Sequence, residues 1–249
     1  MSFKSSVLLV IFAGMIAAVP ASAAVCSNAS VKGVYGILSS GLNGSLQPAT
    51  SLNRIVADGA GNATGVATKS IDGTIVTYNL TGTYQVNKNC TGTATWTNQN
   101  NETEHDNFFL NNGNKGAFLI QTDSNHVQSS TAVAQGTVTC TNLGVKKTYS
   151  TQLTGLLVST GQVAMSGQLI LNGTGKISGT ATLSVNGSII NSAPVTGSYQ
   201  INSDCSGTAQ IIPQGLSGIN VTLLVLNADK EIMAIETDAN SVVSGMLQQ

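Results

Sequence analysis

Two stretches of the chain are nearly the same peptide: TGTYQVNKNCTGTA at residues 81–94 and TGSYQINSDCSGTA at residues 196–209. A shift of 115 residues superimposes them, and the same shift places IQTDSNHVQS, from Ile120, over IETDANSVVS, from Ile235. Motifs that recur in the same order at one offset indicate an internal duplication. Because solenoid repeats are only about 20–50 residues long, this period predicts two whole domains.

A nearby shift of 114 residues extends the duplication toward the N-terminus. It places DGAGNATG, from Asp58, over NGTGKISG, from Asn172, and it places Cys26 over Cys140. The seam between the copies falls near residues 135–139. We therefore expect a first β-barrel domain at residues 24–137 and a second at residues 138–249.

Residues 1–23 have the pattern of a signal peptide. Lys4 precedes an almost wholly apolar run at residues 7–19, and Ala21 and Ala23 give the small-residue pattern of a cleavage site. The alternative, an N-terminal membrane anchor, needs about 20 apolar residues, which is more than this run supplies. We expect a secreted protein, extracellular or periplasmic, without stable insertion in a membrane.

The composition favours strands and tight turns and excludes one class of partner. The chain has 27 Gly and only 4 Pro, and Thr, Ser and Asn are frequent throughout. Charged residues make up 8% of the chain, the net charge is −1, and Arg54 is the only arginine among 10 basic residues. Such a chain offers no positive surface for nucleic acid, so we expect no nucleic-acid partner.

Within each copy, apolar and polar residues alternate over short runs bounded by Gly, Asn and Asp, which is the pattern of half-buried strands. The second copy repeats the pattern of the first, from residues 147–158 to residues 242–247. In the first copy, strands are expected at residues 31–41, 50–58, 63–71, 74–87, 91–98, 103–111, 116–122 and 127–134.

Eight sequential strands with short links predict an all-β fold of two tandem, duplicated, eight-stranded antiparallel up-and-down barrels, since closure removes exposed sheet edges. A pair of β-sandwiches is the alternative. A single sixteen-stranded membrane pore is disfavoured, because such pores need aromatic girdles at both interfaces and this chain is poor in aromatic residues.

The elements DGAGN, TGTYQVNKNCTGT and IQTD, present in both copies in similar form, resemble a group of secreted bacterial proteins. These proteins carry DGxG, TGTYxV and DCTGT motifs on the strands of a small β-barrel and are mostly uncharacterised. The resemblance spans nearly the whole mature chain. It implies a barrel similar to the allene-oxide-cyclase and calycin type. Plant allene oxide cyclases have a similar fold, but their sequence is not found here. The resemblance therefore implies no catalytic activity for this chain.

The repeated motif itself is interpreted as core and bend rather than as a ligand site. Tyr84, Val86 and Cys90 share the parity of one strand face, as do their counterparts in the second copy, and we assign this face to the barrel interior. Gly92 follows the cysteine and permits a bend or a close backbone approach.

No stretch carries a convincing catalytic, cofactor or metal motif, and we predict none of these sites. The cluster ETEHD, at residues 102–106, is interpreted as a solvated outer face, with His105 opposite to its three carboxylates. His126 is interpreted as a surface residue beside a turn. GAGNATG resembles a phosphate-binding loop, but strands on both sides indicate a hairpin turn.

Three classes of function remain. The first is a non-catalytic structural or adhesive protein, which the missing catalytic constellation favours. The second is a binder of a small apolar ligand inside a barrel, since eight-stranded barrels can enclose one. The third is an isomerase or cyclase that works by positioning alone. Both histidines, the only tryptophan (Trp96) and the ETEHD cluster belong to the first copy, so we expect any site to lie unequally in the two copies.

Four cysteines allow three disulfide pairings, and export makes their oxidation expected. Cys26 precedes Cys90 by 64 residues, and Cys140 precedes Cys205 by 65 residues. Each copy thus contains its own pair, as expected if one ancestral domain already held a disulfide before duplication. We predict the pairs Cys26–Cys90 and Cys140–Cys205, each joining the start of a domain to the corner between its fourth and fifth strands.

Overall fold

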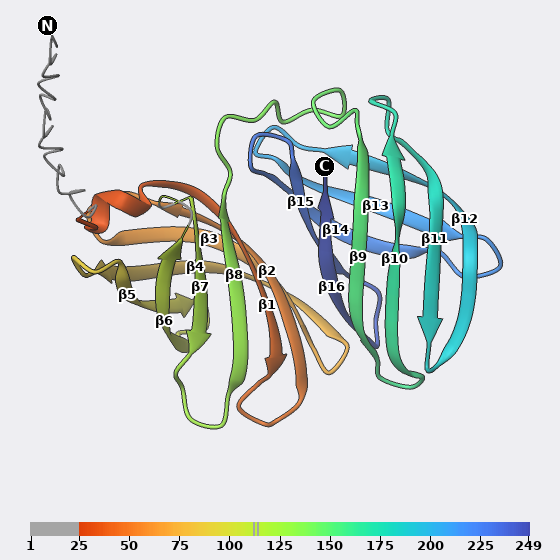
Figure 1. Ribbon diagram of the computed structural model, residues 1–249. Helices are drawn as coiled ribbons and strands as arrows, with labels where there is room; N and C mark the ends of the chain where they lie inside the picture. Colours follow the sequence, from red (N-terminus) through yellow and green to blue (C-terminus); the bar gives the residue numbers. More distant parts are fainter. Residues whose placement is uncertain (1–24, 112, 114) are drawn as a thin grey trace, which may run out of the picture.

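The computed structural model describes residues 25–111, 113 and 115–249, and it consists of two closed antiparallel β-barrels that lie side by side (Figure 1). The expected signal peptide, residues 1–23, lies outside the described residues. No helix in these ranges is long and apolar enough to span a membrane. The first barrel contains β1 (Gly33–Leu42), β2 (Pro48–Ala57), β3 (Asn62–Ile71), β4 (Thr74–Val86), β5 (Thr91–Asn98), β6 (Thr103–Asn111), β7 (Gly116–Gln121) and β8 (Val127–Ala134).

The second barrel repeats this arrangement after a linker that leads from β8 to β9. The expected seam between the copies falls in this linker. The strands are β9 (Thr148–Leu157), β10 (Gly161–Leu171), β11 (Lys176–Val185), β12 (Ser188–Ile201), β13 (Ser206–Pro213), β14 (Ile219–Leu226), β15 (Glu231–Glu236) and β16 (Ser241–Gln248).

The up-and-down barrel topology predicted from the sequence is confirmed. Each strand pairs with its sequence neighbours, and each barrel closes by pairing its first strand with its last, β1 with β8 and β9 with β16. This closure distinguishes the fold from the alternative of two sandwiches. The strand bounds follow the predicted ones closely. β1 starts at Gly33, later than expected, because a short 3-10 helix, η1 (Asn28–Val31), precedes it.

Alternate residues of each strand fill the barrel interiors. In the first barrel, Ile55, Tyr84 and Phe108 belong to one buried cluster. In the second barrel, Leu169 and Tyr199 occupy a corresponding cluster. The period-two pattern that predicted the strands therefore also selects the inward residues.

One end of each barrel, here called the disulfide end, is built from the repeated motifs. The disulfides join Cys26 to Cys90 and Cys140 to Cys205, with Cα–Cα distances of 5.0 and 4.6 Å, and this is the predicted pairing. Cys90 lies in the β4–β5 turn with a φ of 67°, so the regular strand ends before it, at Val86.

Hydrogen bonds join the DGxG turn to the TGTY strand at the disulfide end. The Tyr84 hydroxyl accepts a bond of 2.8 Å from the Gly59 amide, and the Tyr199 hydroxyl accepts one of 2.9 Å from the Gly173 amide. A Cβ atom on Gly92 would overlap the Phe108 ring, so this glycine permits the close approach expected of it. The repeated peptide is therefore a structural unit of core, turn and crosslink.

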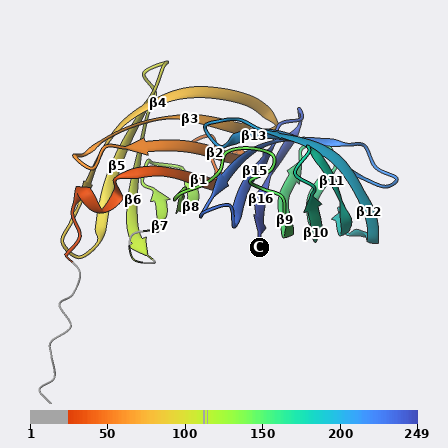
Figure 2. The ribbon, with the colours of Figure 1, turned by 90° about the horizontal axis from the view of Figure 1, so that it is seen from above.

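The two barrels pack against each other through strands β1, β2 and β8 of the first and β14, β15 and β16 of the second, side by side in both ribbon views (Figures 1 and 2). Polar contacts accompany this apolar interface. Thr50 Oγ1 donates to Ser244 Oγ at 2.8 Å, and Arg54 Nε donates to the carbonyl of Asp204 at 2.9 Å. The buried apolar side chains at the interface are Leu52, Leu224, Leu226, Met233 and Ile235.

Candidate functional site

The two barrels differ at the end opposite the disulfide, here called the far end. In the first barrel this end is filled by polar and charged side chains that point inward. Lys69 from β3 forms an ion pair with Glu104 from β6, and Trp96 Nε1 donates a hydrogen bond of 2.9 Å to Asp106 Oδ2. A cavity of only about 20 Å³ remains among them, which is room for about one water molecule.

This arrangement corrects the interpretation of ETEHD as a solvated outer face. Glu104 and Asp106 line the interior of the barrel, because they share the parity of the core residue Phe108. His105 lies on the opposite, exposed face, as alternation predicted. The alternation correctly placed Glu104 and Asp106 on the strand face opposite to His105. The high density of charge led to the wrong assignment of that face to the solvent.

The environment of Asp106 favours its neutral form. Burial raises the pKa of the carboxyl from 3.8 to about 6, and the nearby charges of Glu104 and Asp123 act in the same direction. The hydrogen bond from Trp96 and the charge of Lys69 oppose this shift. Because only about 20 Å³ remains free among these side chains, the network is a packed polar plug with little room for a ligand.

The far end of the second barrel is an open, largely apolar pocket of about 510 Å³. Its volume lies within the range of about 300–1,000 Å³ that is usual for small-molecule sites. The apolar side chains that line this pocket include Leu153, Val163, Met165, Leu183, Ile219 and Val243.

The strand register relates these residues directly to the polar plug. Trp96 pairs with Glu104 in the first barrel as Ile211 pairs with Ile219 in the second. Ser39 pairs with Ser51 as Leu153 pairs with Met165. The duplication offsets also place Leu183 at the position of Lys69, Val221 at that of Asp106 and Val243 at that of Gln128.

Two carboxyl groups line the apolar pocket. Glu236 ends β15 and shares the inward parity of Ile232 and Ala234, and the residue is only 6% exposed. Burial raises its pKa from 4.5 to about 7, an effect that the Ser241 hydroxyl opposes and the charge of Asp238 supports.

Asp238 lies at the rim of the pocket, in the turn after β15, and is already engaged. Its two carboxylate oxygens accept hydrogen bonds of 2.7 Å from the backbone and side-chain amides of Asn220. His105 and Asp123 make the same contacts in the first barrel, at 2.8 and 2.7 Å. Since Asn220 makes in the second barrel the contact that His105 makes in the first, the contact stabilises a turn and does not require an imidazole.

The remaining sequence candidates are structural. His126 ends the β7–β8 turn, where its Nδ1 lies 3.2 Å from the Ser124 carbonyl oxygen. In the β2–β3 turn, Asp58 Oδ1 accepts hydrogen bonds from the amides of Ala60, Gly61 and Asn62, which is a hairpin turn rather than a phosphate loop. Within the described ranges, no group of three His, Cys, Asp or Glu residues is placed to hold a metal ion.

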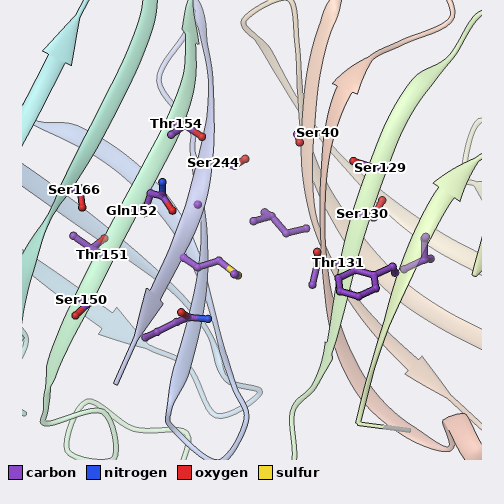
Figure 3. Close-up of a pocket in the computed structure, with 16 residues that line it drawn as sticks. Ser40, Ser129, Ser130, Thr131, Ser150, Thr151, Gln152, Thr154, Ser166 and Ser244 are labelled. Carbon is purple, nitrogen blue, oxygen red and sulfur yellow. The ribbon is translucent and has the colours of Figure 1, made fainter. Parts of the chain in front are cut away.

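A third hollow, of about 660 Å³, lies between the barrels (Figure 3). Side chains from both barrels meet there: Ser40, Ser129 and Thr131 face Gln152 and Ser244 across it. The lining contains apolar side chains as well as hydroxyl and amide groups, and no charged side chain. Such groups occupy the outer faces of strands throughout this Ser- and Thr-rich chain, so the groove specifies no ligand class.

Comparisons with known proteins show a structural likeness but no related sequence. No protein-family model matches the chain, and a search of curated proteins finds no match. The isotype 1 transferrin binding protein B from serogroup B Neisseria meningitidis is similar in structure, with a TM-score of 0.37 and 9% sequence identity. The match covers 87% of this chain and 74% of that one.

Proposed function

We propose that this tandem β-barrel protein is an exported, non-catalytic binder of a small apolar ligand, and that the far end of the second barrel is the binding site. The observation that carries the proposal is the pocket of about 510 Å³ walled by Leu153, Met165 and Leu183. Burying apolar ligand surface against such walls contributes roughly 25 cal/mol per Å² before the cost of association.

The internal comparison supports this site over the interior of the first barrel. The positions of Leu183 and Ile219 are held in the first copy by Lys69 and Glu104 of the plug, which leaves about 20 Å³. A fold that closes one far end with charge and leaves the other apolar and open has the asymmetry expected of a single binding site.

The proposal includes export of the protein from the cytoplasm and its resemblance to secreted bacterial barrel proteins. The disulfides in both barrels fit an oxidising compartment outside the cytoplasm. The resemblance of the motifs to secreted bacterial barrel proteins fits that location too. A purely structural or adhesive role, which the sequence favoured, gives no reason for the apolar pocket. An isomerase or cyclase would use the same pocket, with Glu236 as the group to test.

Titration calorimetry with 1-octanol tests the proposal on the oxidised, mature chain. We expect saturable binding by the wild type and its loss in Val163→Trp, which fills the pocket from its wall. Ile170→Trp is the matched control, because Ile170 lies on the same strand and is 44% exposed. Absence of binding by the wild type, or equal loss in both variants, would contradict the proposal.

A further inference from the structure

We infer that the ligand of the second barrel is a hydrophobic amine: an apolar body carrying a cationic nitrogen that pairs with Glu236. The inference rests on the proposed binding function and adds the chemical class of the ligand. Glu236 is the acidic residue that projects into the pocket from the barrel interior, and it is only 6% exposed. A carboxyl buried among apolar side chains is costly unless it meets a partner.

The polar groups around the pocket do not supply a cationic partner. The lining contains two acidic residues, Glu236 and Asp238, and no Lys, Arg or His. The Asp238 oxygens already accept two hydrogen bonds from Asn220, which leaves Glu236 as the group available to a ligand.

Positive charge in the second copy is concentrated at the other end of the barrel. Its four lysines are Lys146 and Lys147, just before β9, Lys176, at the start of β11, and Lys230, just before β15. All of these positions belong to the disulfide end. The far end therefore has a negative field within low-dielectric walls, which attracts a cation and disfavours a carboxylate ligand such as a fatty acid.

The first barrel provides the natural comparison for this carboxyl. The position of Glu236 is held there by Gln121, which has the same length and no charge. Leu153, Leu183 and Val243 of the pocket replace polar residues of the first barrel, whereas this position holds an amide in one copy and an acid in the other. A largely apolar wall with one buried acid at its inner face matches an amphiphile with a single cationic group.

Three probes of equal chain length separate the inference from the function on which it rests: 1-octanol, octylammonium and octanoate. At about pH 8, above the raised pKa of Glu236, we expect octylammonium to bind about tenfold more tightly than 1-octanol, because a charge-assisted hydrogen bond is roughly twice as strong as a neutral one. Octanoate should bind more weakly than either.

Glu236→Gln, which installs the residue of the first barrel, should abolish the preference for octylammonium over 1-octanol. Glu231→Gln is the control: it lies on the same strand, is also buried, and accepts hydrogen bonds from Asn227 and Gln248 away from the pocket.

If 1-octanol binds and octylammonium binds no more tightly, the inference is wrong while the binding function stands. If the preference for the amine persists in Glu236→Gln, the assignment of the carboxyl is wrong. If none of the three probes binds, the proposed function itself is wrong.

Discussion

Tyr84 in the first barrel and Tyr199 in the second share a position and accept the same hydrogen bond from a glycine amide. Asp106 and Val221 also share a position, yet one is a carboxyl in a polar plug and the other is a buried apolar side chain. The disulfide ends of the two barrels have thus stayed alike, whereas the far ends have diverged. Duplicated chains show in this way which parts the fold requires and which parts are free to specialise.

Removing the disulfide should have the largest effect, and the effect should be equal in the two barrels. Each crosslink closes a long loop, with sequence separations of 64 and 65 residues. Loss of either one should lower the free energy of unfolding by about 4 kcal/mol. Cys26→Ala/Cys90→Ala and Cys140→Ala/Cys205→Ala, compared by denaturant unfolding under oxidising conditions, measure this. A difference of more than about 2 kcal/mol between the pairs would show that the disulfide ends are not equivalent.

Single residues can be exchanged between the far ends of the two barrels. Such an exchange should lower the free energy of unfolding strongly only when a polar-plug residue is placed in the second barrel. Val221→Asp places the carboxyl of the first barrel at a site that is 2% exposed and has no Trp96 counterpart. We expect a loss of at least about 3 kcal/mol, since the charge is buried without a partner.

The reverse exchange, Asp106→Val, should cost no more than about 1 kcal/mol, because relief of a buried carboxyl offsets the hydrogen bond lost by Trp96. Calorimetric unfolding of both variants decides the matter. Equal losses would mean that the plug is not specific to the first barrel.

The first barrel should become more stable on mild acidification. The pKa of Asp106 is raised from 3.8 to about 6, so the folded state binds the proton more tightly than the unfolded chain does. The stabilisation is fully present below the unfolded value and is lost as the pH rises through about 6. It amounts to at most about 3 kcal/mol.

Trp96 is the only tryptophan and donates to Asp106, so its fluorescence reports unfolding of this barrel. The charges of Glu104, Asp123 and Lys69 act on the same carboxyl and contribute to the profile. Asp106→Asn should flatten the change between about pH 4 and pH 6. An unchanged profile in that variant would assign the effect to other groups.

The smallest expected effect again concerns the ends that stayed alike. Tyr84→Phe and Tyr199→Phe each remove one hydroxyl that accepts from a glycine amide. Each should cost about 1 kcal/mol in unfolding free energy, and the two costs should agree within about 0.5 kcal/mol. Phe108→Leu, within the core of the first barrel, shows the scale of a packing change in the same assay.

Sequence periodicity predicted the barrels well because strand parity and turn residues act locally. The alternation around Tyr84 and the turn at Asp58 suffice to place strands, and the duplication placed both disulfides. The far ends were harder to predict, because the side a strand face turns to depends on closure of the sheet. Glu104 and Asp106 have core parity, yet their charge favours solvent until Lys69 and Trp96, distant in sequence, are brought beside them.

Glu236 was not among the sequence candidates. Glu236 is the last residue of an apolar strand and shares the parity of Ala234, which was the only sign that its side chain points inward. The same pattern also fits a strand that ends at the surface. The offset of 115 residues that relates it to Gln121 was the signal that could have drawn attention to it.

Methyl-resolved NMR of the mature, oxidised protein during titration with 1-octanol tests most directly whether the second barrel alone holds the binding site. We predict chemical-shift changes at the methyl groups of Leu153, Met165, Leu183 and Val243, which line the pocket. The methyl groups of Ile55 and Leu80, inside the first barrel, should not shift. Changes centred on the first barrel, or equal changes in both, would contradict this assignment.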